Sequence, residues 1–409
     1  MDKIKVLVVD DTIVYRKIVS DVLKDIPDVE LVGAASNGKT AVARIASLKP
    51  DIVTLDIEMP EMNGIEVLEY IKQNSLPTSA VMLSTLTQKG SDMTIKALEL
   101  GAFDFISKPD EGTMAQNMAK VKDALVPIIN AFKRQKLFRT SLKPSSSNPS
   151  IGTSGAFTSR KSTILPTGAT HLTPSTATSQ TVSSNLSSKA HIQKLKSDLK
   201  GEIVRPSTII RRQTPSSIIG IGISTGGPKA LAVMMPMLTT KLNVPVLIVQ
   251  HMPPVFTKSL AKSLDAKCSL EVKEAEDGET LRANTVFIAP GGMQMKIVAG
   301  ADGKSRKIKL TDDPPENSCK PSVDYLFRSI AEHYVGRATA VIMTGMGSDG
   351  TKGLEHIKRN GGVIIAQDKD SCTVYGMPKE PIESGIADVV APLEHIAEEI
   401  TKTVILKNS

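Results

Sequence analysis

The sequence contains no tryptophan, few other aromatic residues and only three cysteines. Aromatic residues make up 3% of the chain, too few for the stacking surfaces on which single-stranded nucleic acids bind. The cysteines, Cys268, Cys319 and Cys372, are widely separated, and neither they nor the six histidines follow the spacing of a zinc site. The composition therefore predicts reduced thiols, no structural zinc and no nucleic-acid surface.

A long hydrophobic run and a signal peptide are also lacking. No apolar run in the sequence approaches the roughly 20 residues of a membrane-spanning helix. The start of the chain, MDKIKVLVVDD, has neither the form nor the cleavage site of a signal peptide. We expect a cytoplasmic protein that does not insert into a membrane. With 409 residues, the chain is long enough for two or more domains.

Positive charge is concentrated in the middle of the chain, whose net charge is +7. Residues 1–125 contain 14 Lys and Arg against 19 Asp and Glu, residues 126–215 contain 14 against 2, and residues 216–409 contain 22 of each. From Ser141 to Ala190, 23 of 50 residues are Ser or Thr, which bury too little apolar surface to fold. We predict a domain at 1–125, a disordered basic linker at 126–215 with a weak helical segment near Ile192, and a second domain at 216–409.

The first domain alternates strands and helices. Apolar runs predict strands in KVLVVDD, VELVGAAS, DIVTLDI, SAVMLST and AFDFISKP, with helices such as GIEVLEYIKQ between them. This pattern is typical of a parallel sheet covered on both faces, which binds ligands at the carboxyl ends of its strands. Charged residues stand at those ends: Asp10, Asp11, Asp56 and Lys108. Carboxylates there can hold Mg²⁺ or accept a phosphoryl group, and a lysine can stabilise the product's charge.

These residues, in this order, resemble the receiver domain of two-component response regulators, which has a flavodoxin-like fold. The resemblance implies that Asp56 is the phosphoacceptor, with a histidine kinase as the phosphodonor. It also implies that Mg²⁺ is bound by Asp10, Asp11 and Asp56 together with the backbone carbonyl of Glu58.

The same resemblance implies a phosphorylation switch in the first domain. Ser84, or less favourably Thr85, would bind the phosphoryl group, and Lys108 would pair with it. Phe105 would be the aromatic side chain that changes position. The first domain is therefore expected to regulate whatever the second domain does.

In the second domain the strand and helix alternation resumes at Ser216 and predicts a doubly wound, mostly parallel α/β sheet. Two strands end at Ser224 and His251, and Asp349 lies in the loop after a third. The residue types of a Ser-His-Asp hydrolytic triad would then meet at one edge of the sheet.

The segment GIGISTGGP, which contains Ser224, fits two kinds of site. A dinucleotide-binding turn requires an acidic residue at the end of the next strand, where Gln250 and His251 stand instead. A nucleophile elbow requires the pattern G-x-S-x-G, which Gly222 to Gly226 match. The order Ser, His, Asp differs from that of α/β-hydrolases, but triads are defined by geometry and not by chain order.

Each candidate also has a purely structural alternative. Ser224 could cap a helix, and His251 could be a strand-end histidine satisfied by the backbone. Asp349 could be a turn residue, and Thr225 is as consistent with a helix start as with a supporting hydroxyl. The backbone amide of Met346, between two glycines, could bind an oxyanion. The joint placement of the first three at one edge favours a catalytic site.

The motifs GISTGGP, QHMPP, IAPGG, PSVDYLFRS, TGMGSDG and YGMP, in this order behind a receiver, resemble the chemotaxis protein-glutamate methylesterase family, CheB. The resemblance implies a triad of Ser224, His251 and Asp349, with Met346 in the oxyanion hole. The substrates would be glutamate methyl esters, and glutamines to be deamidated, on methyl-accepting chemoreceptors. Hydrolysis would need no cofactor, and Mg²⁺ would belong to the receiver alone.

Regulation is expected to follow from the pairing of the two domains. Unphosphorylated, the receiver would cover the catalytic edge near Ser224 and His251, and phosphorylation would weaken that docking. The linker is longer and richer in Ser and Thr than this family usually has. Two other functions remain possible for the second domain: binding of nucleotide or nucleic acid, or a non-catalytic scaffold that binds receptors.

Overall fold

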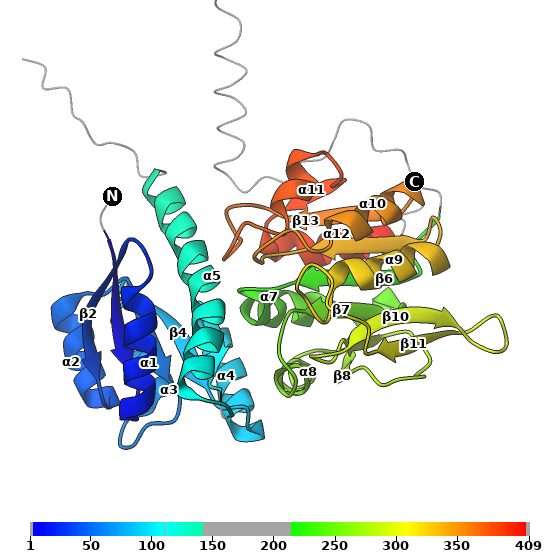
Figure 1. Cartoon of the computed structure of the whole chain (residues 1–409). Helices are drawn as coiled ribbons and strands as arrows, with labels where there is room; N and C mark the ends of the chain where they lie inside the picture. Colours follow the sequence, from blue (N-terminus) through cyan, green and yellow to red (C-terminus); the bar gives the residue numbers. More distant parts are fainter. Residues whose placement is uncertain (1–2, 110, 142–213, 406–409) are drawn as a thin grey trace, which may run out of the picture. The chain divides into compact units, whose positions relative to one another are not determined.

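The computed structural model of the chain describes residues 3–109, 111–141 and 214–405, and for 138–141 the backbone alone (Figure 1). Residues 142–213, the larger part of the predicted linker, therefore lie outside the described residues, as does the helical segment predicted near Ile192. The described residues up to Leu137 and those from 214 onward cluster as one compact unit. Within the described residues, no helix has both the length and the apolar character needed to cross a membrane.

The first domain is a five-stranded parallel sheet with strand order β2-β1-β3-β4-β5. Its strands are β1 (Ile4–Val9), β2 (Val29–Ala35), β3 (Ile52–Asp56), β4 (Ser79–Ser84) and β5 (Asp104–Ser107). Its helices are α1 (Ile13–Lys24), α2 (Gly38–Leu48), α3 (Gly64–Gln73), α4 (Gln88–Leu100) and α5 (Met114–Ser141). The sequence prediction of this sheet is confirmed, because each apolar run forms a strand.

The last helix of this domain is longer than the sequence analysis allowed. The sequence predicts a domain boundary at residue 125, whereas α5 continues to Ser141 and contains Pro127. The continuation is stabilised by the apolar side chains of Ile128, Ile129 and Phe132, which are buried in the domain core. The basic segment therefore begins as a helix of the first domain.

The second domain is built on a seven-stranded parallel sheet with strand order β14-β13-β12-β6-β7-β9-β8. The strands are β6 (Ile218–Ile223), β7 (Val246–Gln250), β8 (Glu271–Glu274), β9 (Thr285–Ile288), β12 (Ala338–Ile342), β13 (Val363–Gln367) and β14 (Val389–Ala391). Strands β10 (Gln294–Ala299) and β11 (Arg306–Thr311) form a separate antiparallel pair. The predicted mostly parallel architecture is confirmed.

Helices cover this sheet on both faces (Figure 1). They are α7 (Gly227–Met234), α8 (Phe256–Asp265), α9 (Val323–His333), α10 (Thr351–Arg359), α11 (Lys379–Glu383) and α12 (Leu393–Val404), with short 3₁₀ turns at Met235–Met237 and Thr240–Leu242. The sheet order places β6 between β12 and β7. The loops that follow these three adjacent strands therefore leave the sheet side by side, as ligand-binding loops of doubly wound sheets do.

Candidate active site

Ser224 stands directly after β6, in a sharp turn that leads into α7. Gly226 has a φ of +80°, and a Cβ there would lie 2.4 Å from the side chain of Thr373. A Cβ on Gly345 would lie 2.7 Å from the Cβ of Ser224 and 2.4 Å from the sulfur of Met377. Only glycine fits at these two positions, so the predicted elbow around Ser224 is formed by close backbone approach.

One buried side chain bonds to the backbone of both Ser224 and His251. Gln250, at the end of β7, donates through Nε2 to the carbonyl oxygens of Ser224 at 3.0 Å and of His251 at 3.3 Å. It stands where a dinucleotide site would have its acidic residue. Gln250 thus links the serine strand to the histidine loop, and no carboxylate is present for a ribose.

His251 and Asp349 are joined by a hydrogen bond of 2.8 Å between the ring Nε2 and Oδ2. The other ring nitrogen, Nδ1, lies 3.7 Å from Sγ of Cys319. Within the described part of the chain, no hydrogen bond joins the Ser224 hydroxyl to the ring. The predicted triad residues are therefore at one edge of the sheet, with the histidine–aspartate contact made and the serine–histidine contact open.

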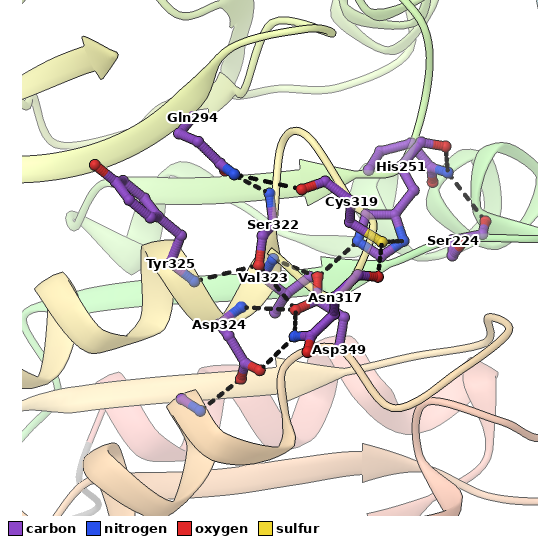
Figure 2. A network of polar contacts seen from close by, with 12 residues as sticks. Ser224, His251, Gln294, Asn317, Cys319, Ser322, Val323, Asp324, Tyr325 and Asp349 are labelled. Carbon is purple, nitrogen blue, oxygen red and sulfur yellow. Dashed lines mark hydrogen bonds and ion pairs between the residues drawn. The ribbon is translucent and has the colours of Figure 1, made fainter. Parts of the chain in front are cut away.

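Asp349 accepts hydrogen bonds from the loop before α9 and from the first residues of that helix (Figure 2). The donors are Asn317 Nδ2 (2.9 Å), Ser322 Oγ (2.8 Å), the amides of Val323 (2.7 Å) and Asp324 (3.2 Å), and His251. The amino-terminal end of a helix favours a negative charge. The carboxylate is thus held ionised in one orientation, with both oxygens occupied.

Asn317 bridges two buried carboxylates. Its Nδ2 donates to Asp324 at 2.8 Å as well as to Asp349, and the amide of Gly353 donates to Asp324 at 2.6 Å. Burial raises the pKa of Asp324, although the bond from Gly353 lowers it. A neutral amide between two acids limits their mutual repulsion.

Burial and hydrogen bonding shift the pKa values of the pair in opposite directions. Burial lowers the pKa of His251, but the hydrogen bond to Asp349 and the nearby Cys319 outweigh it and raise this pKa to about 9. Burial raises the pKa of Asp349, but the hydrogen bond and charge of His251 outweigh it and lower this pKa to about 2. The carboxylate of Asp349 therefore stabilises positive charge on the ring, the charge that His251 acquires whenever it accepts a proton.

Met346 and Thr225 differ in their surroundings. Met346 lines the same cavity of about 310 Å³ as Ser224 and His251, and within the described residues its backbone amide has no hydrogen-bond acceptor. The hydroxyl of Thr225 donates to Oδ2 of Asp104 at 2.7 Å. It is therefore engaged with β5 of the first domain and does not bond to another residue of the triad region.

Contacts within the compact unit bring β5 and α4 of the first domain to α7 and α8. The rings of Phe105 and Phe256 lie 4.5 Å apart between centroids, and the hydroxyls of Ser91 and Ser259 lie 2.7 Å apart. Asp104 and Phe105 line the cavity that contains Ser224. Burial raises the pKa of Asp104 to about 6, although the bond from Thr225 lowers it.

A second cluster of charged residues lies in the first domain, at the carboxyl ends of β1 and β3. Lys108 Nζ lies 2.8 Å from Asp10 Oδ2 and 2.7 Å from Asp56 Oδ2. Oxygens of Asp10, Asp11 and Asp56 lie within 4.8 Å of one another. Burial raises the pKa of Asp56 to about 6; Lys108 lowers it, and the neighbouring carboxylates raise it. An all-oxygen cluster with excess negative charge fits a hard divalent cation.

Of the predicted switch residues, Ser84 is the last residue of β4 and Thr85 follows it. The Ser84 hydroxyl donates to the carbonyl of Gly90 at 3.2 Å and accepts from Thr94 at 2.7 Å. Thr85 lies beside Glu58, whose carboxylate accepts from the Thr85 hydroxyl at 3.4 Å. Ser84 is thus bound inside the domain, while the hydroxyl of Thr85 contacts Glu58.

The supporting residues Asn317, Cys319 and Ser322 were missed by the sequence analysis. The loop that contains the first two has no periodic pattern, and Asn317 adopts a left-handed φ of +51°. One usable signal was present in the motif PSVDYLFRS, because a serine before an apolar helical pattern is typical of an N-cap. A helix that starts after Ser322 would present free backbone amides at its first turn. Such amides bind carboxylates, so this helix start is a candidate partner for Asp349.

Comparison with known proteins gives matches to both domains. Residues 219–400 match the CheB methylesterase family, and residues 6–119 match the response regulator receiver domain. A protein-glutamate methylesterase/protein-glutamine glutaminase from Desulfotalea psychrophila is 50% identical over 99% of this chain and 100% of its own length. The one from Bacillus subtilis is 40% identical over 98% of each chain. The crystal structure of the Thermotoga maritima CheB methylesterase catalytic domain, 44% identical, covers 46% of this chain and 99% of its own length with a TM-score of 0.45.

Proposed function

This chain belongs to the CheB methylesterase family, and we propose that it is a phosphorylation-regulated serine hydrolase that demethylates glutamate methyl esters, and deamidates glutamines, on chemoreceptors. One observation carries the proposal for the site: His251 is hydrogen-bonded to a buried carboxylate, Asp349, at the sheet edge where Ser224 occupies a glycine-flanked elbow. A strand-end histidine satisfied by the backbone would not need this partner.

The reaction follows from the two ring nitrogens of His251. Because Nε2–H is donated to Asp349, Nδ1 of the neutral ring is the nitrogen that can accept the proton of Ser224. The serine oxygen attacks the side-chain carbonyl of the substrate, and the imidazolium then protonates the leaving methanol or ammonia. Water, deprotonated by the same nitrogen, releases the glutamate carboxylate and restores the serine.

The negative charge on the substrate oxygen needs donors near Ser224. The backbone amide of Met346 lines the cavity and is not engaged elsewhere among the described residues, which supports its assignment to the oxyanion hole. Preorganised amides of this kind contribute about 3–4 kcal/mol to lowering the barrier. Thr225 supports the elbow by its position, since its hydroxyl is bound to Asp104.

Phosphorylation is assigned to Asp56, with a chemotaxis histidine kinase as the phosphodonor. Asp10, Asp11, Asp56 and the carbonyl of Glu58 would hold Mg²⁺, which neutralises charge on the phosphoryl oxygens when it is bound. Lys108 already contacts Asp56 and would pair with the phosphoryl group. Ser84 would move from its bonds within the domain toward that group.

The unphosphorylated receiver is proposed to act as a lid on the catalytic site. Support comes from Asp104 and Phe105, which border the cavity that contains Ser224, and from the bond between Asp104 and Thr225. Both receiver residues belong to β5, directly before Lys108. A movement of Phe105 on phosphorylation would therefore loosen the ring contact with Phe256 and admit the receptor helix.

The direct test is methanol release from methylated receptor by the full-length protein and its variants. Ser224→Ala and His251→Ala should each lower turnover on the order of a million-fold while the fold stays intact, because neither change removes core volume. The exposed Ser269→Ala is the matched control and should keep parental turnover. Near-parental hydrolysis by Ser224→Ala would overturn the assignment, and tight nucleotide binding that survives this change would favour a nucleotide-binding domain instead.

A further inference from the structure

The thiol of Cys319 lies at the catalytic histidine and has no part in the proposed reaction. Its Sγ is 3.7 Å from Nδ1 of His251, the nitrogen opposite the one bonded to Asp349. Figure 2 shows the sulfur and the imidazole ring facing each other beside the Asp349 network. Cys319 is only half-buried, so the thiol and the ring can be reached from solvent.

We propose that His251 and Cys319 form a binding site for Zn²⁺, supported by Asp349, through which this cation inhibits the enzyme. One ligand atom from each of these residues lies within 4.8 Å of the others. Zinc binds thiolate sulfur and imidazole nitrogen at about 2.3 and 2.1 Å, and two such ligands around one tetrahedral ion lie about 3.6 Å apart by those bond lengths. The separation of Sγ and Nδ1 matches that spacing without rearrangement.

Asp349 would orient the histidine and not bind the cation directly. Both of its oxygens already accept hydrogen bonds, which leaves little capacity for a metal. Zinc-bound histidines commonly donate their other ring N–H to a carboxylate, which fixes the ring and strengthens the nitrogen as a ligand. The contact between Nε2 and Oδ2 provides that arrangement, and water would complete the coordination of the ion.

Binding of the cation would block the reaction at one atom. With Nε2–H donated to Asp349, Nδ1 is the nitrogen proposed to accept the Ser224 proton, and the metal would occupy its lone pair. On binding, the Cys319 thiol and the protonated fraction of Nδ1 would each release a proton to solvent, with no change in oxidation state. Inhibition rests on the proposed hydrolase function, whereas cation binding does not.

The chemistry of the donors separates this site from the cluster in the receiver. Asp10, Asp11 and Asp56 offer oxygen alone, which suits Mg²⁺, while thiolate and imidazole select zinc and similar ions. Co²⁺ can replace zinc as a probe because its bond to a thiolate gives an absorption band in the near ultraviolet that oxygen ligands do not give. The band therefore reports on a cysteine ligand even when the receiver site is also occupied.

The experiment titrates full-length Ser224→Ala, which removes turnover but leaves the proposed ligands, with Co²⁺ and then with competing Zn²⁺. We expect a thiolate band that zinc abolishes, that Cys319→Ser removes, and that the control Cys268→Ser retains. In the hydrolysis assay, each protein is compared with its own metal-free rate, and Cys319→Ser should require at least about tenfold more Zn²⁺ for half inhibition. A chelator should restore the rate.

The two readouts distinguish failure of this proposal from failure of the proposed function. A thiolate band that persists in Cys319→Ser, or the absence of any band in the Ser224→Ala protein, would overturn the zinc site whatever the enzyme does. Zinc inhibition that is unchanged by Cys319→Ser would also overturn it. A Cys319-dependent band in a chain that hydrolyses no methyl ester would leave the binding site in place and refute the hydrolase assignment.

Discussion

Replacing Asp349 with asparagine tests whether the bonds around this carboxylate both stabilise the domain and hold the catalytic histidine. Oδ1 accepts three of its hydrogen bonds and Oδ2 accepts two, and all five donors are N–H or O–H groups. An asparagine has a single acceptor oxygen. The NH₂ group would therefore face two donors, Val323 and His251, if it took the Oδ2 position. It would face the other three if it took the Oδ1 position.

The expected loss of stability can be worked out in two ways. Two unsatisfied donors in a buried site cost about 1–3 kcal/mol each, which gives a lower free energy of unfolding by about 2–6 kcal/mol. Independently, the pKa of Asp349 is about 2 in the folded protein, against about 3.9 in an unfolded chain. This difference corresponds to about 2.5 kcal/mol of stability at neutral pH. The two values agree at the lower end of the range.

The same shift predicts an acid dependence with a definite sign. A carboxylate whose pKa is lowered by folding contributes stability above the unfolded pKa and loses it as the pH falls through the folded pKa. The parent protein should therefore lose this contribution between about pH 4 and pH 2. Asp349→Asn should lack this part of the acid dependence, because it has no proton to bind in that range.

The catalytic effect should be larger than the effect on stability. The NH₂ group should take the Oδ2 position, because that leaves two donors unsatisfied and the Oδ1 position would leave three. There it would donate toward Nε2 instead of accepting from it and would favour the opposite tautomer of His251, a change that lowers turnover on the order of ten-thousandfold in serine hydrolases. Denaturant unfolding and methanol release would be measured on the same preparation. Asp277→Asn, at an exposed ion pair with Lys309, is the matched control and should alter stability by less than about 0.5 kcal/mol. Parental stability with less than a tenfold loss of rate in Asp349→Asn would refute the reasoning.

Three further predictions concern the elbow and the receiver. Gly345→Ala should lower turnover at least about tenfold, because the new Cβ would lie 2.7 Å from that of Ser224; parental turnover in a folded Gly345→Ala protein would contradict the close approach. Deletion of residues 1–137 should raise basal hydrolysis, and Asp56→Asn in the full chain should stay at the basal rate when a phosphodonor is added; a truncated protein no faster than the unphosphorylated parent would exclude the lid. Thr225→Val, which removes the bond to Asp104, should raise the basal rate of the full chain by up to about tenfold and leave that of the truncated protein unchanged; equal effects in both would place the role of Thr225 within the catalytic site.

The sequence predicted both sheets because the apolar runs are bounded by charged or glycine-rich segments. In the first domain, Val6 to Val9 are fully buried and Asp10 follows at the strand end, so the strand and its functional residue are encoded together. The same holds for β6 and Ser224. Where a buried apolar run is followed directly by a polar residue, one chain segment is sufficient to place that residue at the carboxyl edge of a sheet.

Local sequence patterns do not predict the end of the first domain or the residues that hydrogen-bond to Asp349. The extension of α5 depends on burial of Ile128 and Phe132 against the rest of the domain, which the composition of the surrounding basic segment conceals. Asn317 reaches Asp349 from 32 positions away, out of a loop with left-handed backbone at Asn317 and Ser318. Such contacts are set by the tertiary fold, and no local pattern specifies them.

The triad region divides into a part whose geometry is set by the backbone and a part that is free to change. Two of the donors to Asp349 are main-chain amides at the start of α9, so among substitutions of these two residues only proline would remove the N–H group. The ring of His251 is oriented by this fixed carboxylate through Nε2. Nδ1, in contrast, faces the thiol of Cys319 and has no bond to the Ser224 hydroxyl. During hydrolysis the proton must pass from the Ser224 hydroxyl to Nδ1. A cation bound to Nδ1 would compete with that transfer. Substrate binding and the position of Cys319 therefore both affect Nδ1 of His251. The hydrogen bonds that hold Asp349 in place are the same in either case.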